Sequence, residues 1–345
     1  MRVSSSLKDV AARAGVSART VSNVVNGSAR VSTQTRQRVQ EAIDELGYRP
    51  NLAARNLRAG RTGVIGLAIP ELHSPYFGEL AGLLVDEARR RSWTVIIDQT
   101  HGDAEAERRL LTGDGGRAMD GLIISPWALE AQEVATTARP LPVVLLGERS
   151  PQGLADRVAV DNVAAADEAT THLLALGRRR VAAIGLQPHL HNGTAEQRAE
   201  GYRSALRRAG VTPKPRWERS VTSLHRQDGA RAMAELLDGD DGDTPDAVFA
   251  FTDELALGAL HMAHARGLRV PDDLAVVGFD DIEDSRFSHP TLTTVSPDKR
   301  QIAERALQCL ADRIYSPENE VPALDLTIPH RLVVRGSTGP GAQAH

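Results

Sequence analysis

The spacing of apolar residues predicts one kind of structure before residue 50 and another after residue 62. In the first stretch, apolar side chains recur every three or four positions, as on the buried face of a helix. In the second, short apolar runs alternate with longer amphipathic stretches. Short apolar runs are typical of strands that a sheet buries on both faces. We therefore predict an all-α head followed by an α/β body.

Helices in the head are bounded by residues that start and stop helices. The predicted segments run from Ser6 to Gly15, from Ser17 to Gly27 and from Ser32 to Gly47. The first opens with a capping box, since Asp9 lies three residues after Ser6. Helix, short turn, helix and supporting helix is the architecture of a helix-turn-helix module. A three-helix bundle for protein contacts is the alternative.

The body is predicted to alternate between strands and helices. Strands are expected at 64–69, 94–97, 122–124, 143–146, 180–184, 247–250 and 274–277. Helices are expected at 75–91, 103–112, 162–176, 195–209, 228–237 and 254–266. Such alternation forms parallel sheets that helices cover on both faces. Because the body is too long for one sheet, we expect two similar lobes.

Charge separates the head from the body. The chain has a formal net charge of -4, yet residues 1–61 contain eleven Lys or Arg against four Asp or Glu. A basic module on an acidic body is typical of a protein that presents one end to a polyanion. The alternative is a solvated charged surface.

Composition and absent motifs argue against other classes. The single cysteine, Cys309, rules out an internal disulfide and a Cys-based metal cluster. No apolar run approaches the roughly 20 residues that span a bilayer, and residues 1–6 do not resemble a signal peptide. These features lead us to expect a cytoplasmic location. GxSxG, P-loop and HExxH motifs are missing, so we expect no enzymatic activity, cofactor or metal. A transport-type sugar-binding protein, which would need export, is the alternative function.

The head resembles that of the LacI/GalR family of bacterial repressors. The likeness lies in residues 7–11, 14–17, 20–22, 24, 26–27 and 47–51. It implies a nucleoid-associated protein whose second helix enters the major groove of double-stranded operator DNA. The residues that it implies at the DNA are Leu7, Ser17, Ala18, Arg19, Thr20, Ser22, Asn23, Asn26 and Tyr48 in the head, with Asn51, Ala54 and Leu57 beyond it.

Asn23 departs from this family pattern, in which Arg is usual. An Arg fork reads guanine, whereas Asn is shorter and prefers adenine. We therefore expect an operator whose bases differ from those that the family usually reads. Contact of Asn23 with phosphate or water alone is the alternative.

Residues 50–61 are predicted to form a hinge. Pro50 suits a helix start, but the segment is only about two turns long and too short to be stable alone. Residues 53–57 resemble the family's hinge helix, which implies that Leu57 of each subunit wedges into the minor groove at the operator centre. Two wedges at one step require a homodimer and a pseudo-palindromic operator. Packing of Leu57 on the body is the alternative.

The body also resembles the LacI family, whose core is similar to two-lobed periplasmic sugar-binding proteins. The likeness includes residues 74–77, 120–123, 160–162, 176–179, 201–202, 256–260, 270–271, 276–281 and 290–295. It implies a head at 1–49 and a sensor domain at 62–336. Lobe 1 would be about 62–160 with 291–320, and lobe 2 about 161–290 with 321–336, before a flexible polar tail at 337–345.

A ligand cleft is expected between the lobes, at the carboxyl ends of the strands. Asp280 can accept hydrogen bonds from a polyol, and Arg198 offers a planar donor fork. Many sugar-responsive members carry Asn at the position of Thr252 and Asp at that of Gly147. The remaining candidates are the aromatic Tyr76 and Phe77, Asp161 at a cleft-lining position of the family, and His73 and Trp127 as replacements for the two lost anchors.

A carbohydrate is the expected effector, because it is the commonest in the family. The alternatives for the cleft residues are a helix cap or turn for Asp280, a surface ion pair for Arg198, and core packing for the aromatic residues and His73.

Replacing Leu57 by Gly tests the hinge. Leu57→Gly should reduce operator affinity while leaving ligand binding unchanged, because the wedge touches only DNA. Titration of operator DNA and of ligand into the purified variant measures both. Equal operator affinity of variant and parent would contradict the wedge.

Overall fold

The protein consists of two compact units, Met1–Gly63 and Val64–His345. The computed structural model describes residues 6–25, 31–48, 61–112, 118–138, 141–188, 190, 193–239, 244–316 and 322–339. The division lies two residues beyond the predicted boundary at residue 61. Asn26 and most of the predicted hinge, including Pro50, Asn51, Ala54 and Leu57, lie outside the described residues.

The described part of the head contains the helices α1 (Leu7–Ala14), α2 (Ala18–Val25) and α3 (Thr33–Leu46). They begin at their predicted serine caps, and α1 and α3 end at their predicted glycines. The Ser6–Asp9 capping box is present, and Gly15 ends α1 with a left-handed backbone conformation. Apolar side chains from all three helices form the buried core, with Val10, Val21 and Val39 fully enclosed.

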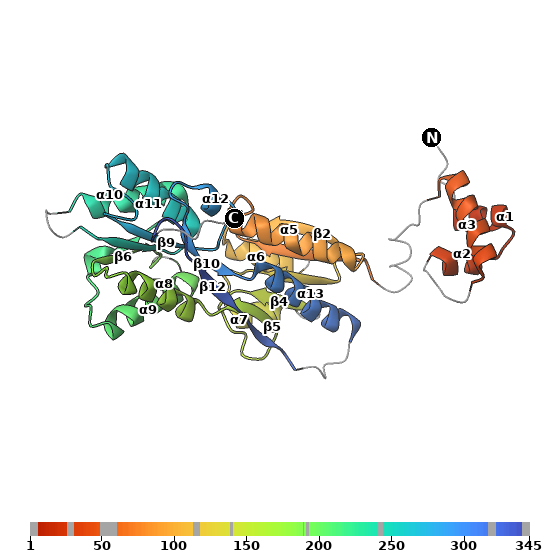
Figure 1. Cartoon of the computed structure of the whole chain (residues 1–345). Helices are drawn as coiled ribbons and strands as arrows, with labels where there is room; N and C mark the ends of the chain where they lie inside the picture. Colours follow the sequence, from red (N-terminus) through yellow and green to blue (C-terminus); the bar gives the residue numbers. More distant parts are fainter. Residues whose placement is uncertain are drawn as a thin grey trace. The chain divides into compact units, whose positions relative to one another are not determined.

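Lobe 1 is a parallel sheet with helices on both faces (Figure 1). Its strands lie in the order β11-β5-β4-β3-β1-β2. Their bounds are β1 Val64–Ile69, β2 Thr94–Gln99, β3 Gly121–Ile124, β4 Val143–Leu146, β5 Asp156–Val160 and β11 Asp325–Ile328. One face packs on α5 (Pro75–Arg90) and α13 (Lys299–Tyr315), and the other on α6 (Ala104–Thr112) and α7 (Ala131–Thr137).

Lobe 2 repeats this arrangement with the strand order β12-β10-β9-β8-β6-β7, in which only the β10–β12 pair is antiparallel. The strands are β6 Val181–Leu186, β7 Glu218–Ser220, β8 Ala247–Ala250, β9 Ala275–Phe279, β10 Thr293–Pro297 and β12 His330–Val333. The helices are α8 Asn162–Ala175, α9 Gly193–Arg208, α10 Arg226–Leu237, α11 Asp253–Ala265 and the short α12 Asp284–Phe287, with a 3-10 turn at Pro215–Trp217. Lobe 2 has one continuous apolar core.

The chain crosses between the lobes three times, and two crossings correct the predicted boundaries. The first falls after β5, near the predicted residue 160. The others fall between β10 and α13 and between β11 and β12, so 291–297 belong to lobe 2 and 325–328 to lobe 1. These two strands are short, and apolar periodicity does not indicate which of two similar sheets a strand joins.

The first residues of the predicted flexible tail are packed against lobe 2. Ser337 and Thr338 are buried, although 337–345 was expected to be flexible. The Ser337 hydroxyl accepts a hydrogen bond from the Thr293 backbone N–H at 2.8 Å and donates one to the Val276 carbonyl at 2.6 Å. These hydrogen bonds hold Ser337 against lobe 2. No helix among the described residues is long and apolar enough to cross a membrane.

Replacing Gly258 by Ala tests the packing of α10 against α11. A Cβ on Gly258 would lie 1.9 Å from the carbonyl oxygen of Arg226, so the two helices would have to separate. We expect a loss of about 1–3 kcal/mol in the free energy of unfolding, measured by urea denaturation. The control is Gly82→Ala on α5, where a Cβ meets nothing within 4 Å.

Gly82→Ala should leave the free energy of unfolding unchanged or raise it by up to about 1 kcal/mol, because Ala has the higher helix propensity. Equal stability of Gly258→Ala and Gly82→Ala would contradict the close approach of α10 and α11.

Candidate DNA interface and ligand cleft

Helix α2 presents polar side chains opposite its buried Val21 and Val24. Arg19 is exposed, and Ser22 and Asn23 are half-buried. The Ser17 hydroxyl caps the helix, accepting from the Thr20 backbone N–H at 3.1 Å. A capped helix with exposed polar residues in its first turns has the form that enters a major groove.

The other predicted DNA residues of the described head are packed to different degrees. Leu7, Ala18 and Tyr48 are partly buried against the apolar core of the head. The Thr20 hydroxyl lies 2.9 Å from that of Ser17. An exposed ion pair of 2.6 Å between Arg13 and Glu45 joins α1 to α3. The structure thus places the predicted DNA residues of the described head in one small module.

A cavity of about 120 Å³ lies between the two lobes of the sensor unit. Its wall includes residues that follow β3, β4, β5, β8 and β9, as expected for a cleft at the carboxyl ends of parallel strands.

Arg198 of α9 forms the buried centre of the cleft and is only 8% exposed. Its Nε donates to the Asn162 side chain at 2.9 Å, and its Nη1 donates to the Phe251 carbonyl. The guanidinium also lies 3.4 Å from the centre of the Phe279 ring. Burial lowers the pKa of Arg198, while the nearby Asp280 opposes that shift.

Asp280 faces Arg198 across 3.8 Å, and both belong to lobe 2. It directly follows β9 and has a φ of 114°, a conformation that a non-glycine residue rarely adopts. Its backbone N–H donates to the Val295 carbonyl at 2.8 Å, which holds the turn. Burial raises the pKa of Asp280 to about 7, although Arg198 and then Lys299 oppose this. Strained backbone of this kind is often found at binding sites.

A second buried carboxylate, Asp253 at the start of α11, supports the turn that carries Asp280. It accepts hydrogen bonds from the Ser285 and Thr294 hydroxyls, each at 2.6 Å, and from the Ile282 backbone N–H at 3.0 Å. Burial, and after it the charge of Asp280, raises the pKa of Asp253 to about 8. Asp253 therefore positions the cleft wall rather than contacting a ligand.

Polar contacts between the lobes close the cleft. The Thr194 hydroxyl of lobe 2 donates to Glu148 of lobe 1 at 2.5 Å. The Lys299 ammonium donates to Glu79 of lobe 1 at 2.5 Å and to the Asp280 backbone carbonyl of lobe 2 at 2.8 Å. Sequence analysis did not identify Glu148 or Lys299, because each acts through a residue distant in the chain.

Aromatic side chains of lobe 1 form the other wall. Phe77 lies edge-on to Tyr76, with ring centres 5.2 Å apart, and edge-on to Trp127, at 6.2 Å. All three line the cavity, while Tyr76 and Phe77 also pack against the lobe 1 core. Burial raises the pKa of the Tyr76 hydroxyl, so that it stays protonated. Tyr76 and Phe77 thus have the packing role that was the alternative, and they also face the cavity, where their ligand role stays a prediction.

Two predicted cleft residues do not line the cavity. Asp161 is exposed and caps α8, accepting from the Ala164 backbone N–H at 2.9 Å, whereas the next residue, Asn162, faces the cleft. His73 is exposed and lies beside His225. In each case a residue one or two positions along the chain lines the cavity instead: Asn162 beside Asp161, and Ser74 and Glu71 near His73.

The two departures from the family pattern have different outcomes. Thr252 lines the cavity, and its hydroxyl caps α11 by accepting a hydrogen bond from the Leu255 backbone N–H at 3.2 Å. Gly147 has a φ of 111°, and a Cβ there would meet nothing within 4 Å. The neighbouring Glu148 brings a carboxylate to the cleft instead. Its closeness to Gly147 in sequence was the signal that could have found it.

Comparisons with known proteins agree with both units. Residues 6–51 match the family profile "Bacterial regulatory proteins, lacI family", and 170–338 match "Periplasmic binding protein-like domain". Catabolite control protein A of Priestia megaterium is 33% identical over 338 residues, or 96% of this chain and 98% of that protein.

Two solved structures are similar over nearly the whole chain. The lac repressor dimer bound to operator and the anti-inducer ONPF has a TM-score of 0.82 and 28% identity, covering 98% of this chain and 100% of that one. A complex of the transcriptional regulator CelR with cellobiose has a TM-score of 0.71 and 30% identity, covering 96% and 99%.

The head and the two-lobed sensor together define a DNA-binding transcription regulator, and the similar proteins above are regulators rather than enzymes. The chain belongs to the LacI family.

Replacing Arg19 by Ala tests the assignment of α2 as the helix that reads DNA. Arg19→Ala should relax the choice of base at one operator position by about 1–3 kcal/mol, because the exposed side chain would contact a base edge. Binding-site selection from random DNA measures this. An unchanged base preference would refute the contact.

Proposed function

We propose that this protein is a repressor that binds a pseudo-palindromic operator as a homodimer in the bacterial cytoplasm and senses a carbohydrate in its interlobe cleft. The observation that carries the proposal is the buried Arg198–Asp280 pair, which offers donors and an acceptor beside aromatic rings. A sugar presents hydroxyl groups, which can hydrogen-bond to the polar wall, and apolar ring faces, which can pack on the aromatic wall.

The charge of the cleft favours an uncharged polyol over an anion. Four carboxylates line it, namely Glu71, Glu148, Glu254 and Asp280. Two guanidinium groups among the described residues also line it. Arg149 donates to the backbone carbonyls of Leu129 and Trp127, at 2.8 and 3.1 Å, and Arg198 donates to Asn162 and the Phe251 carbonyl. A phosphate or carboxylate ligand would meet like charges at close range, whereas hydroxyl groups can donate to the same oxygens.

The likeness to solved regulators supports both parts of the proposal. One similar structure is a repressor dimer bound to its operator, and another is a regulator in complex with cellobiose. On this basis the proposed DNA contacts remain those of the sequence analysis, with Arg19 and Asn23 at base edges, Ser17, Thr20 and Ser22 near phosphates, and Leu57 as the wedge.

Ligand binding in the cleft can change the affinity for the operator through the arrangement of the two lobes. A ligand changes operator affinity only if it binds one lobe arrangement more tightly than another. Since polar contacts such as Thr194–Glu148 hold the cleft closed, a ligand that bridges the same walls would shift that balance.

Thermal unfolding with a panel of sugars, sugar phosphates and purines tests the effector class. At pH 8, above the pKa of about 7 of Asp280, its carboxylate can accept hydrogen bonds. A binder at a hundred times its dissociation constant should add about 2.7 kcal/mol of stability. Asp280→Asn should lose that shift.

The matched control is Asp161→Asn, which retains a helix-capping side chain outside the cavity. It should keep the full shift. A ligand shift that survives in Asp280→Asn, or a response to sugar phosphates alone, would contradict the proposed polyol site.

A further inference from the structure

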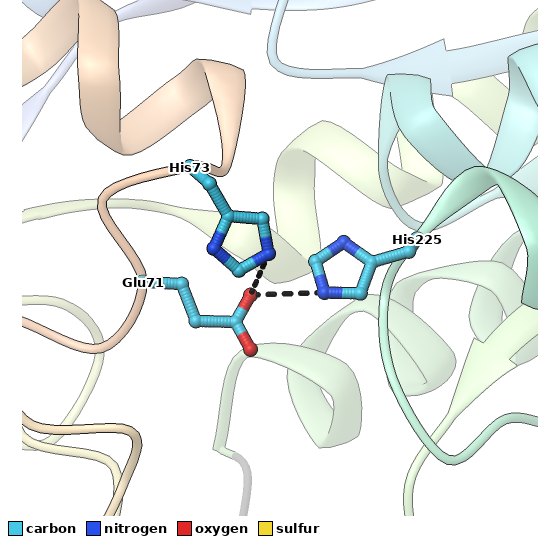
Figure 2. A group of neighbouring side chains, drawn as sticks. All are labelled: Glu71, His73 and His225. Carbon is cyan, nitrogen blue, oxygen red and sulfur yellow. Dashed lines mark ion pairs between the residues drawn. The ribbon is translucent and has the colours of Figure 1, made fainter.

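Three potential metal-ligating side chains converge at the edge of the cleft, and they come from both lobes (Figure 2). Glu71 and His73 lie in the loop between β1 and α5 of lobe 1. His225 directly precedes α10 of lobe 2. One ligand atom from each of the three residues lies within 4.8 Å of those of the other two.

Glu71 lies between the two imidazole rings. Its Oε2 is 3.1 Å from His225 Nε2 and 3.9 Å from His73 Nε2. The ring centres are 5.0 Å apart. In a tetrahedral zinc site with bonds of about 2.0–2.2 Å, ligand atoms lie roughly 3.4 Å apart, so side-chain movements of about 1 Å would complete the site.

The second nitrogen of His225 already has the partner that a metal-ligating histidine usually has. Its Nδ1 lies 3.2 Å from Glu254 Oε2, and Arg226 Nε lies 3.5 Å from the other oxygen of that carboxylate. A carboxylate on the far nitrogen fixes the tautomer and orients the ring toward a metal. Glu71 and Glu254 therefore face the two nitrogens of one ring.

A cation between His225 Nε2 and Glu71 would have an imidazole nitrogen and a carboxylate oxygen as ligands, while Nδ1 of the same ring faces Glu254. It would also engage His73, whose Nε2 lies 3.9 Å from the same Glu71 oxygen and whose side chain is 64% exposed.

We propose that Glu71, His73 and His225 bind one divalent transition-metal ion, with zinc as the best match, and that this ion joins the two lobes. Two imidazoles and a carboxylate suit zinc and similar ions, whereas magnesium and calcium prefer oxygen ligands alone. Three protein ligands leave a fourth position open. Since Glu71 and His225 also line the ligand cavity, that position is available to water or to a cleft ligand.

Calorimetric titration of the full-length protein with zinc chloride tests the site. We expect one ion per chain with a micromolar or lower dissociation constant. His225→Ala and His73→Ala should each weaken binding at this site at least tenfold, and Glu254→Gln by about ten- to a hundredfold through loss of the orienting carboxylate. Magnesium chloride should give no comparable binding.

The matched control is His264→Ala, which removes an exposed histidine near the end of α11 in lobe 2. It should bind zinc like the parent. Cobalt(II) gives an independent readout, since the intense visible absorption of a tetrahedral site should appear in the parent and be lost in His225→Ala. Equal zinc affinity in the parent and His225→Ala, or no high-affinity ion in the parent, would overturn the proposal.

The bridging role has its own measurement. Zinc should raise the thermal unfolding temperature of the parent but not that of His225→Ala, in which only lobe 1 ligands remain. An equal rise in both proteins would place the ion on one lobe and overturn the bridge. None of these three measurements uses DNA or sugar, so their failure would leave the proposed operator and polyol functions intact.

Discussion

The guanidinium of Arg198 has to keep its charge with only 8% of the residue exposed. Burying a cation in this way is unfavourable unless its hydration is replaced by hydrogen bonds and opposite charge. Its partners are Asn162 after β5, the Phe251 carbonyl after β8 and Asp280 after β9. Because these groups must meet at one point, the ends of three strands and the start of α8 are fixed relative to one another. The binding wall of lobe 2 depends on that meeting point.

Closure of the cleft depends on hydrogen bonds between the two lobes. The described contacts across it are polar, such as Thr194 to Glu148 and Lys299 to the Asp280 carbonyl. A hydrogen bond that involves a charged group usually contributes about 1.5–3 kcal/mol. Contacts of that strength leave the lobe arrangement sensitive to a ligand or an ion that joins the same walls. The proposed polyol and metal sites would act on this one balance.

Much of the fold could be predicted because its signals are local. Ser6, Ser17 and Ser32 begin the head helices as expected, and the apolar run at 64–69 is β1. Elements near the chain crossings were missed, including β10, α13, β11 and β12. Their strands are only four or five residues long. Which sheet they join depends on packing between distant segments, and no periodicity encodes that choice.

The sequence by itself determined the helix-turn-helix head, the alternating body and the position of Asp280 after a strand, because caps and apolar spacing act over a few residues. The tertiary structure decided which neighbouring side chain faces the cleft. Asp161 caps α8 while Asn162 contacts Arg198, and Glu148 supplies a carboxylate beside Gly147. It also brought His225 to Glu71 from the opposite lobe. Such contacts depend on how the two sheets and their helices pack against each other, and local spacing carries no information about that.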